Sequence, residues 1–329
     1  MKFAVQGKAA EAEGAVPAAG RRKKFKPCRI RHSFKSNLPF YLLFAPAIVL
    51  TLIFSYFPMV GVLLAFEDYS MFTGFFSPLT DYAGFGHFVK IFSTPSIYRV
   101  IWNTFYLNAL TLLINFPAPI IFALLLNEIL NRPFKRTVQT ISYLPYFLSW
   151  VSVTGMAVSM LSEYGAINNI IVALGGSRAS FLSSEGLFIP VYIILTVWKG
   201  LGWGSIIYLS SISSASPDLY ESAQLDGAGR FMQAWHITLP TLLPVTMIQL
   251  ILNVGQVFGS NFDLVYGLTE GIHAWSGFEV IATWVYRNGI VQNDFEMGTA
   301  LSLFQSVIAL ALTLTVNKIS AKVSSISMW

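Results

Sequence analysis

Six long apolar runs, separated by polar segments, occupy most of the chain between residues 39 and 325. Each run has roughly the 20 residues that a helix needs to cross the hydrocarbon core of a bilayer. The predicted spans are Pro39–Phe66, Val100–Leu126, Ile141–Leu161, Ile189–Ser213, Thr241–Phe262 and Gly298–Ile319. Because backbone groups in lipid must pair within the protein, we predict an all-α membrane protein with six transmembrane helices.

The overall composition supports a membrane location. The chain has 329 residues, of which 54% are hydrophobic and 11% charged, and its mean hydropathy is +0.60. A soluble domain of this size carries about 25% charged residues. A single cysteine, Cys28, excludes an internal disulfide framework.

The first 38 residues form a basic tail. They hold ten Lys or Arg against Glu11 and Glu13, a balance of +8, without the apolar core of a signal peptide. We expect residues 1–38 to be disordered, to stay on the mature protein and to lie near anionic lipid on the cytoplasmic side. A nucleic-acid or regulatory role for the tail is the weaker alternative.

The distribution of basic residues predicts the orientation. If the N-terminus lies inside, the segments on that side hold 16 Lys or Arg, and the opposite side holds Lys90, Arg99, Arg178 and Arg287. Positive charge favours the cytoplasmic side, so we predict that both termini are cytoplasmic.

The polar segment 214–240 between the fourth and fifth spans has the pattern of a helical hairpin. Ser216 and Pro217 are typical of a helix start, and Gly227 is suited to its end. A second short helix is predicted from Gly229 to Thr238, after which Pro240 opens the next span. An ordinary loop with an interfacial helix would show a similar local pattern.

The same segment resembles the signature loop of membrane subunits in binding-protein-dependent ABC importers. The family pattern is Glu-Ala-Ala, a Gly four residues later, nine residues of any kind and Ile-x-Leu-Pro. The residues in register are Glu221, Ser222, Ala223, Asp226, Gly227, Ile237, Leu239 and Pro240, with Ser222 at a position that is usually Ala. The resemblance implies the type I importer permease fold over residues 39–325 and a coupling helix that docks on an ATPase subunit.

The chain further resembles the carbohydrate branch of that family in P-F-Y-L-L-F-A-P-A-I, I-S-Y-L-P-Y-F-L-S-W and V-W-K-G-L-G-W-G-S-I-I-Y-L. It is most similar to permeases for polysaccharides, aldouronates and lipo-oligosaccharides, which makes an acidic polysaccharide such as alginate a plausible cargo. The resemblance implies a bacterial inner-membrane location, a second and different permease chain, two ATPase subunits that bind ATP and Mg²⁺, and an extracytoplasmic solute-binding protein. It implies no nucleic-acid partner and no cofactor or metal on this chain.

Few polar residues within or beside the spans are candidates for a substrate pathway. They are Lys199, Trp203, Asn253, Gln256, Asn261 and Asp263. An ionisable residue at membrane depth is a functional candidate, but Lys199 can equally snorkel or pair with a carbonyl or with Asp263. The glycines beside it, Gly200 and Gly202 among them, permit either close packing or a break in the helix.

Three long segments are predicted outside the membrane, namely Glu67–Arg99, Glu163–Phe188 and Asp263–Met297. The first contains an amphipathic stretch, G-F-G-H-F-V-K-I-F, that is expected to lie along the membrane surface. These segments can meet a solute-binding protein or simply cap the helix bundle.

Other kinds of chemistry find little support in the sequence. It contains no G-x-x-x-x-G-K-[ST] phosphate loop, and its four histidines have no second ligand at metal spacing. We therefore expect no enzyme activity on this chain and ATP hydrolysis on a separate subunit. The alternatives are an ion-coupled secondary transporter, a membrane-embedded enzyme and an amino-acid or metal-chelate permease.

Overall fold

The computed structural model describes residues 34–69, 82–259, 261–269 and 278–324, and almost all of their regular structure is helical. Most of the predicted basic tail lies outside these residues. The elements, in chain order, are α1 Phe34–Thr51, η1 Leu52–Tyr56, η2 Phe57–Phe66, α2 Gly86–Ser93, α3 Pro95–Asn115, α4 Pro117–Glu128, α5 Arg132–Tyr143, η3 Leu144–Phe147, α6 Trp150–Leu161, α7 Ala166–Ala173, α8 Glu185–Ser213, α9 Pro217–Leu225, α10 Arg230–Gln233, η4 Ala234–Thr238, α11 Leu239–Gly255, α12 Phe262–Thr269, α13 Ile281–Trp284, η6 Val285–Val291 and α14 Phe295–Ser324.

The chain divides into two compact units, Met1–Pro58 and Met59–Trp329. The described part of the first unit is a helical rod of α1, η1 and the start of η2, with Pro39 and Pro46 inside α1. Its side chains are apolar and mostly exposed, among them Leu43 and Phe54. Exposed apolar side chains along a helix of this length are suited to contact with lipid.

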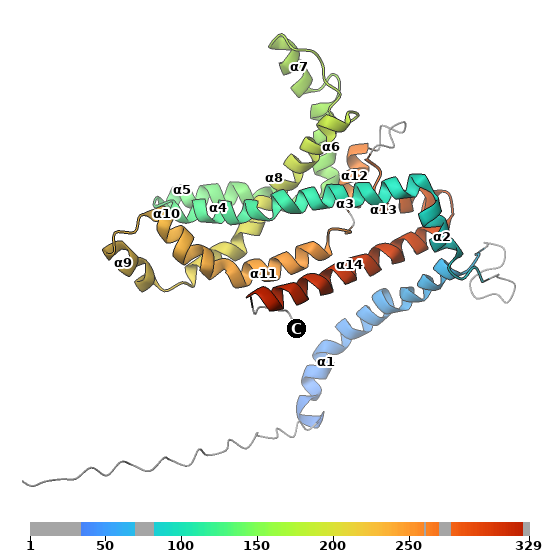
Figure 1. Ribbon diagram of the computed structural model, residues 1–329, viewed down its shortest axis with the longest axis horizontal. Helices are drawn as coiled ribbons and strands as arrows, with labels where there is room; N and C mark the ends of the chain where they lie inside the picture. The colour runs from blue at the N-terminus through green and yellow to red at the C-terminus, as the bar shows by residue number, and fades with distance from the viewer. Residues whose placement is uncertain (1–33, 70–81, 260, 270–277, 325–329) are drawn as a thin grey trace, which may run out of the picture. The chain divides into compact units, whose positions relative to one another are not determined.

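The second unit is a bundle in which α3, continued end to end by α4, runs roughly alongside α8, α11 and α14 (Figure 1). The hairpin region of α9 and α10 lies at one end of the bundle, and α2 and α13 lie at the other. The arm formed by α6 and α7 rises away from the bundle axis. The two ends thus carry the segments predicted to lie on opposite sides of the membrane.

Three apolar clusters hold the second unit together. One joins α2, α13 and α14 through Ile91, Ile281 and Leu301. A second joins α3, α8 and α12 around Leu107, Tyr192 and Leu264, and a third joins α4, α8 and α11 around Ala123, Tyr208 and Leu242. Each of the nine named residues is at most 4% exposed.

The described residues contain five helices that are long and apolar enough to span a membrane, and a sixth span if one bent pair is counted. The five are Leu38–Phe66, Pro95–Glu128, Gly186–Ser213, Arg230–Gly255 and Phe295–Lys322. All six predicted spans therefore correspond to an observed helix or helix pair, which confirms the fold class. The amphipathic stretch in the first segment predicted to be external forms the helix α2, and its position along the membrane surface stays a prediction.

Two spans differ from their predicted form. The predicted third span, Ile141–Leu161, is not one straight helix, because the chain bends by 98° between Arg132–Phe147 and Trp150–Ala173. Pro145 starts the last turn before the bend, and Ser149 is extended. A proline removes a backbone donor and Ser149 leaves the helical conformation, so the helical hydrogen bonds cannot continue across this point.

The predicted fifth span, Thr241–Phe262, is also displaced. Its helix begins at Arg230 and ends at Gly255, so the short helix predicted at Gly229–Thr238 is the first part of the span itself. Pro240 does not separate the two, although it lacks a backbone donor inside this helix, because the π-helical segment Ala234–Thr238 just before it changes the local hydrogen-bond pattern.

Candidate functional site

The hairpin 214–240 is built as two arms around a glycine turn. The first arm, α9, begins at Pro217 and ends before Gly227, whose φ of +80° requires a residue without a side chain or one that tolerates the left-handed region. The backbone N–H of Ala228 donates to the Ala223 carbonyl at 2.8 Å, which closes the end of the helix. Gly227 therefore ends α9 as the sequence predicts.

Ser216 occupies the position before α9, but its side chain makes no capping hydrogen bond. Its backbone carbonyl instead accepts from the Leu219 N–H at 3.2 Å. The helix therefore starts where the sequence predicts, but without the side-chain hydrogen bond that a capping serine usually accepts.

Side chains tie the two arms into one rigid piece. The hydroxyls of Tyr220 and Thr238 lie 3.1 Å apart, one on each arm. The Gln233 amide donates to the Ala228 carbonyl at 2.7 Å, so it holds the turn against the second arm. Arg230 lies 3.5 Å from Glu128 at the end of α4, which links the hairpin to the bundle. These contacts connect α9 to the start of α11 and, through Arg230, to the end of α4.

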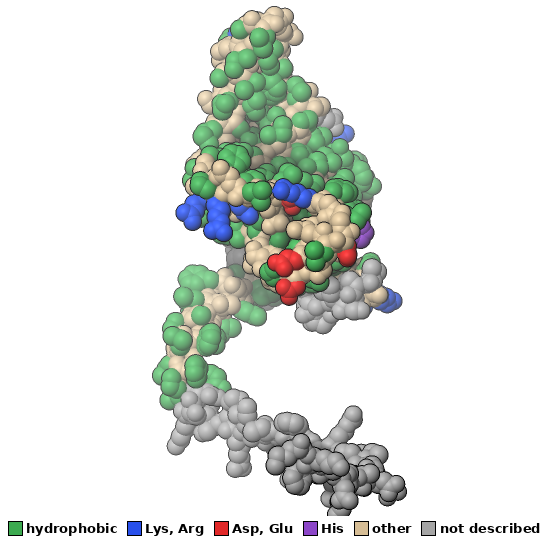
Figure 2. Space-filling view, turned by 90° about the vertical axis from the view of Figure 1, so that its left-hand side faces the viewer, with side chains coloured by type: hydrophobic (Ala, Val, Ile, Leu, Met, Phe, Trp, Pro, Cys, Tyr) green, Lys and Arg blue, Asp and Glu red, His purple; other side chains and the backbone are tan. Residues whose placement is uncertain are grey.

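The outer surface of α9 mixes apolar and acidic side chains. Leu225 is 90% exposed and Leu219 is 54% exposed. Asp218, Glu221 and Asp226 are also exposed, and seen from this end of the molecule acidic and basic side chains gather in separate places (Figure 2). A short helix with exposed leucines and small residues such as Ser222 and Ala223 is suited to a groove on another protein.

The remaining residues of the signature close the hairpin against the bundle. Ile237 and Leu239 are half-buried, and Thr238 between them is buried. The signature residues thus lie on one continuous segment, from the exposed surface of α9 to the first turn of α11.

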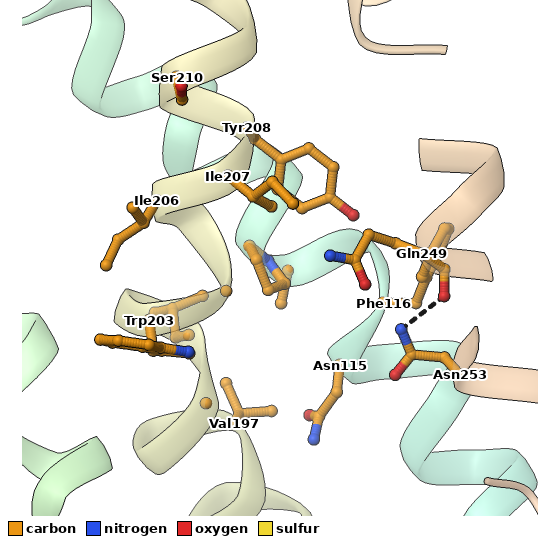
Figure 3. Close-up of a pocket in the computed structure, with 15 residues that line it drawn as sticks. Asn115, Phe116, Val197, Trp203, Ile206, Ile207, Tyr208, Ser210, Gln249 and Asn253 are labelled. Atoms are coloured by element: carbon orange, nitrogen blue, oxygen red, sulfur yellow. Dashed lines mark hydrogen bonds between the residues drawn. The ribbon is translucent and has the colours of Figure 1, made fainter. Parts of the chain in front are cut away.

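A cavity of about 710 Å³ lies between α8, α4 and α11. Trp203 and Tyr208 of α8 and Gln249 and Asn253 of α11 line it. Tyr208 points toward Gln249 and Asn253, whereas the ring of Trp203 points away from them (Figure 3). Asn115, at the end of α3, has a buried side-chain oxygen with no hydrogen-bond partner among the described residues. The cavity therefore combines aromatic faces with amide groups.

Two of the predicted pathway residues, Trp203 and Asn253, line this cavity. Asn253 donates from its amide to the Gln249 carbonyl at 2.7 Å, which leaves its oxygen available toward the cavity. Trp203 stacks on Tyr146 with ring centroids 4.4 Å apart and an interplanar angle of 5°. Its ring is 43% exposed.

The other predicted pathway residues lie elsewhere. Asn261 and Asp263 line a smaller pocket of about 90 Å³ beside Trp150. The Asn261 amide donates to the Tyr192 hydroxyl at 2.5 Å and to the side-chain oxygen of Asn108, so Asn261 joins helices. Gln256 is exposed at the end of α11 and lines neither cavity.

Lys199 is 9% exposed and also lines neither cavity. Its ammonium donates to the Tyr146 carbonyl at 2.8 Å and lies 5.1 Å from the ring centroids of Tyr146 and Trp150. The sequence left three possibilities for Lys199: snorkelling, a bond to a carbonyl and an ion pair with Asp263. In the structure Lys199 bonds to a carbonyl and forms no ion pair with Asp263. Helix α8 is continuous through the glycines, which excludes the predicted alternative of a break.

At the opposite end, one ion pair holds the last segment that the sequence predicts to be external. The Glu279 carboxylate accepts from Arg287 at 2.7 Å, and its side chain is 13% exposed. Burial raises the pKa of Glu279, and the charge of Arg287 opposes that rise. Asn103 of α3 donates to the Glu279 carbonyl at 3.1 Å and so fixes this segment to the bundle.

A comparison with protein families identifies the family of this chain. The family model described as "Binding-protein-dependent transport system inner membrane component" matches residues 115–324, from the end of α3 to the end of α14. The chain belongs to this family. It is a multi-pass protein of the bacterial inner membrane and the permease component of an ABC transporter, as the signature loop predicted.

Curated relatives extend the likeness over almost the whole chain. A permease of *Bacillus subtilis* (strain 168), the polygalacturonan/rhamnogalacturonan transport system permease protein YteP, is 38% identical over 316 residues, 96% of this chain and 98% of the relative. Protein LplB of the same organism is 40% identical over 283 residues, 86% of this chain and 88% of the relative.

Solved structures agree with the fold. A chain from a bacterial ABC transporter involved in the import of the acidic polysaccharide alginate has a TM-score of 0.80 and 36% identity, covering 88% of this chain and 98% of that one. The same transporter in complex with an alginate pentasaccharide-bound periplasmic protein gives a TM-score of 0.81. The predicted type I importer permease fold is thus confirmed.

Several residues of the site were not singled out from the sequence. Tyr146, Asn115 and Gln249 reach the cavity region from three different helices, and Leu225 is the most exposed apolar side chain of α9. The only available signal for Asn115 and Gln249 was an amide inside or beside an apolar run, a pattern shared with amides that merely join helices.

Proposed function

We propose that this protein forms one half of the translocation pathway of an ATP-driven importer for acidic oligosaccharides. The observation that carries the proposal is the near full-length likeness to permeases named for polygalacturonan/rhamnogalacturonan and for alginate import. Both names describe acidic polysaccharides, so a cargo that contains uronic acid units is the common chemistry.

The cavity has the chemistry that such a cargo needs. An aromatic ring such as that of Trp203 packs against the C–H face of a sugar ring, and amides such as Asn253 and Asn115 exchange hydrogen bonds with its hydroxyl groups. The side-chain oxygen of Asn115 is buried and lacks a donor, and a sugar hydroxyl supplies one once this side chain turns toward the cavity that the residue lines.

The complete importer contains several chains. A second, different permease supplies the other half of the pathway, and two ATPase subunits bind ATP and Mg²⁺ and receive the two coupling helices. A solute-binding protein delivers the sugar at the end of the bundle that carries α2 and α13. On this chain α9 is the coupling helix, because its exposed Leu219 and Leu225 and its acidic residues form a docking surface.

Coupling follows from the stiffness of the hairpin. When the ATPase subunits close, they move α9, and the contact between Tyr220 and Thr238 passes that movement to the start of α11. Because α11 lines the cavity with Gln249 and Asn253, the movement changes access to the sugar site.

The test is purification of the complex through a tag on this chain, followed by reconstitution into vesicles. The expected result is recovery of an ATPase and a second permease, with uptake of labelled oligogalacturonate or alginate oligosaccharide that requires internal ATP and the binding protein. Maltotriose serves as a neutral sugar control.

Two outcomes would contradict the proposal. Uptake of the neutral sugar in preference to both acidic sugars would contradict the cargo. Uptake driven by an ion gradient without ATP would support the secondary transporter predicted as the alternative.

A further inference from the structure

Three residues on one face of α8 contact the segment that precedes the 98° bend. Lys199, Gly202 and Trp203 are spaced three and four residues apart, which places them on one side of a helix. A side-chain carbon on Gly202 would collide with the Ser142 carbonyl of α5. Trp203 stacks on Tyr146 of η3. This face of α8 therefore fits the chain just before the bend.

Lys199 contacts both sides of the bend. Its ammonium lies 5.1 Å from the ring centroid of Tyr146, before the bend, and the same distance from that of Trp150, after it. It also donates to the Tyr146 carbonyl at 2.8 Å. One buried cation thus holds a carbonyl and two aromatic faces from two helical segments.

The bend explains why a cation is suited to this position. Ser149 has φ −67° and ψ 150°, so the helix stops there and the carbonyls before it lose their helical donors. An unpaired carbonyl inside a membrane protein costs several kcal/mol in an apolar environment. The Lys199 ammonium supplies a donor, and the two rings stabilise its charge.

The same contacts determine where Trp203 lies. Tyr146 is fixed through its carbonyl and its ring by Lys199, and Trp203 stacks on that ring and lines the cavity of about 710 Å³. A shift of η3 would therefore move the aromatic surface of the cavity, although Lys199 itself lines no part of it.

We propose that Lys199 is a positioning residue, which fixes the bend between η3 and α6 and thereby sets the Tyr146–Trp203 pair against which the sugar packs. Its part in sugar uptake rests on the function proposed above. Lys199 is not a ligand of the sugar in this account, so its role does not depend on the charge of the cargo.

The first experiment measures sugar uptake per ATP hydrolysed in vesicles that contain the full transporter. The variants are Lys199→Met, which keeps the length of the side chain without its charge, and Lys199→Arg, which can still donate to a carbonyl and stack on rings. With oligogalacturonate as the substrate, Lys199→Met is expected to lower uptake per ATP about five- to tenfold, the effect of losing one aromatic contact. ATPase stimulation by the loaded binding protein should stay near that of the unmodified protein, and Lys199→Arg should restore most of the uptake.

The second experiment reports the bend without reference to any substrate. Ser142 is half-buried where α5 meets Gly202, and Ser142→Cys in a Cys28→Ser background gives a single thiol there. Loss of the contacts of Lys199 with Tyr146 and Trp150 should expose residue 142. Lys199→Met is therefore expected to increase the alkylation rate of the thiol at position 142 at least about threefold, and Lys199→Arg should leave that rate unchanged.

A double variant separates positioning from an independent effect. If Lys199 acts through the aromatic pair, Lys199→Met together with Trp203→Ala lowers uptake per ATP no further than Trp203→Ala alone. Additive losses would overturn the proposal, as would an unchanged alkylation rate at residue 142. A loss of ATPase stimulation and of assembly with Lys199→Met would also overturn it, because that pattern indicates a general folding role. If the unmodified transporter moves no acidic sugar, the proposed function fails, and the alkylation rates still decide whether Lys199 holds the bend.

Discussion

Asn115 presents a buried oxygen that the described residues leave without a donor. A structural amide in a membrane bundle is expected to have its hydrogen bonds satisfied by other helices, as Asn108 and Asn261 do for each other. An unsatisfied buried oxygen lowers the stability of the empty protein, and it can bind a ligand only when the side chain turns toward the cavity that Asn115 lines.

Replacement of Asn115 by leucine should therefore separate binding from folding. Asn115→Leu is expected to leave the apparent Tm of the purified complex unchanged or slightly higher, because no existing hydrogen bond of that oxygen is lost. Sugar uptake should fall by about three- to tenfold, the value of roughly one hydrogen bond. The matched control is Asn108→Leu, whose side chain bonds Asn261 and the Thr104 carbonyl and whose loss should lower the Tm. A lowered Tm with normal uptake for Asn115→Leu would assign Asn115 to packing.

Glu279, at the end of the bundle opposite the hairpin, predicts a dependence of stability on pH. Because burial raises its pKa in the folded protein, the protonated carboxyl is favoured by folding. This contribution is fully present below the ordinary glutamate pKa of 4.5 and is lost as the pH rises through the higher folded value. The apparent Tm should therefore rise as the pH falls from 8 toward 5. Glu279→Gln, which mimics the neutral form, should lose this part of the pH dependence, and an identical slope in both proteins would contradict the assignment.

At the scale of elements, the coupling helix illustrates what a sequence pattern can and cannot predict. The position of α9 and its glycine end follow from local residues, because proline starts a helix and a φ of +80° requires glycine. The bend after Phe147 does not follow from hydropathy, because an apolar run reads the same whether its helix is straight or broken. The contact of Tyr146 with Trp203 depends on how two helices pack, which no local pattern contains.

The exposed leucine of α9 allows a direct test of docking. Leu225 is 90% exposed, so Leu225→Glu should change the stability of this chain by less than about 0.5 kcal/mol. Burying a leucine at an interface is worth roughly 1.5–3 kcal/mol, so recovery of the ATPase subunit with this variant should fall about ten- to hundredfold. Leu225→Met, which keeps an apolar side chain, should recover the ATPase normally. Normal recovery with Leu225→Glu would place the docking surface elsewhere on the hairpin.

At the scale of the whole molecule, the hairpin, the cavity and the segments predicted to be external follow one another along the bundle. The hairpin is tied to α4 through the Arg230–Glu128 pair and is continuous with α11, and both helices border the cavity. The opposite end is fixed to α3 through Asn103. Under the proposed function, this arrangement connects a movement of the hairpin at one end to the cavity through α4 and α11.

The orientation can be tested with the single natural cysteine. The count of 16 basic residues against four predicts that the tail, which contains Cys28, lies in the cytoplasm with α9. A membrane-impermeant maleimide should then label Cys28 in inverted membrane vesicles and not in intact spheroplasts. The matched variant carries Leu174→Cys, an 83% exposed position after α7, in a Cys28→Ser background, and the same reagent should label it in spheroplasts only. Labelling of Cys28 from outside would reverse the topology and place α9 away from ATP, which would rule out α9 as the coupling helix. Labelling of both positions from the same side would contradict the odd number of predicted spans between them.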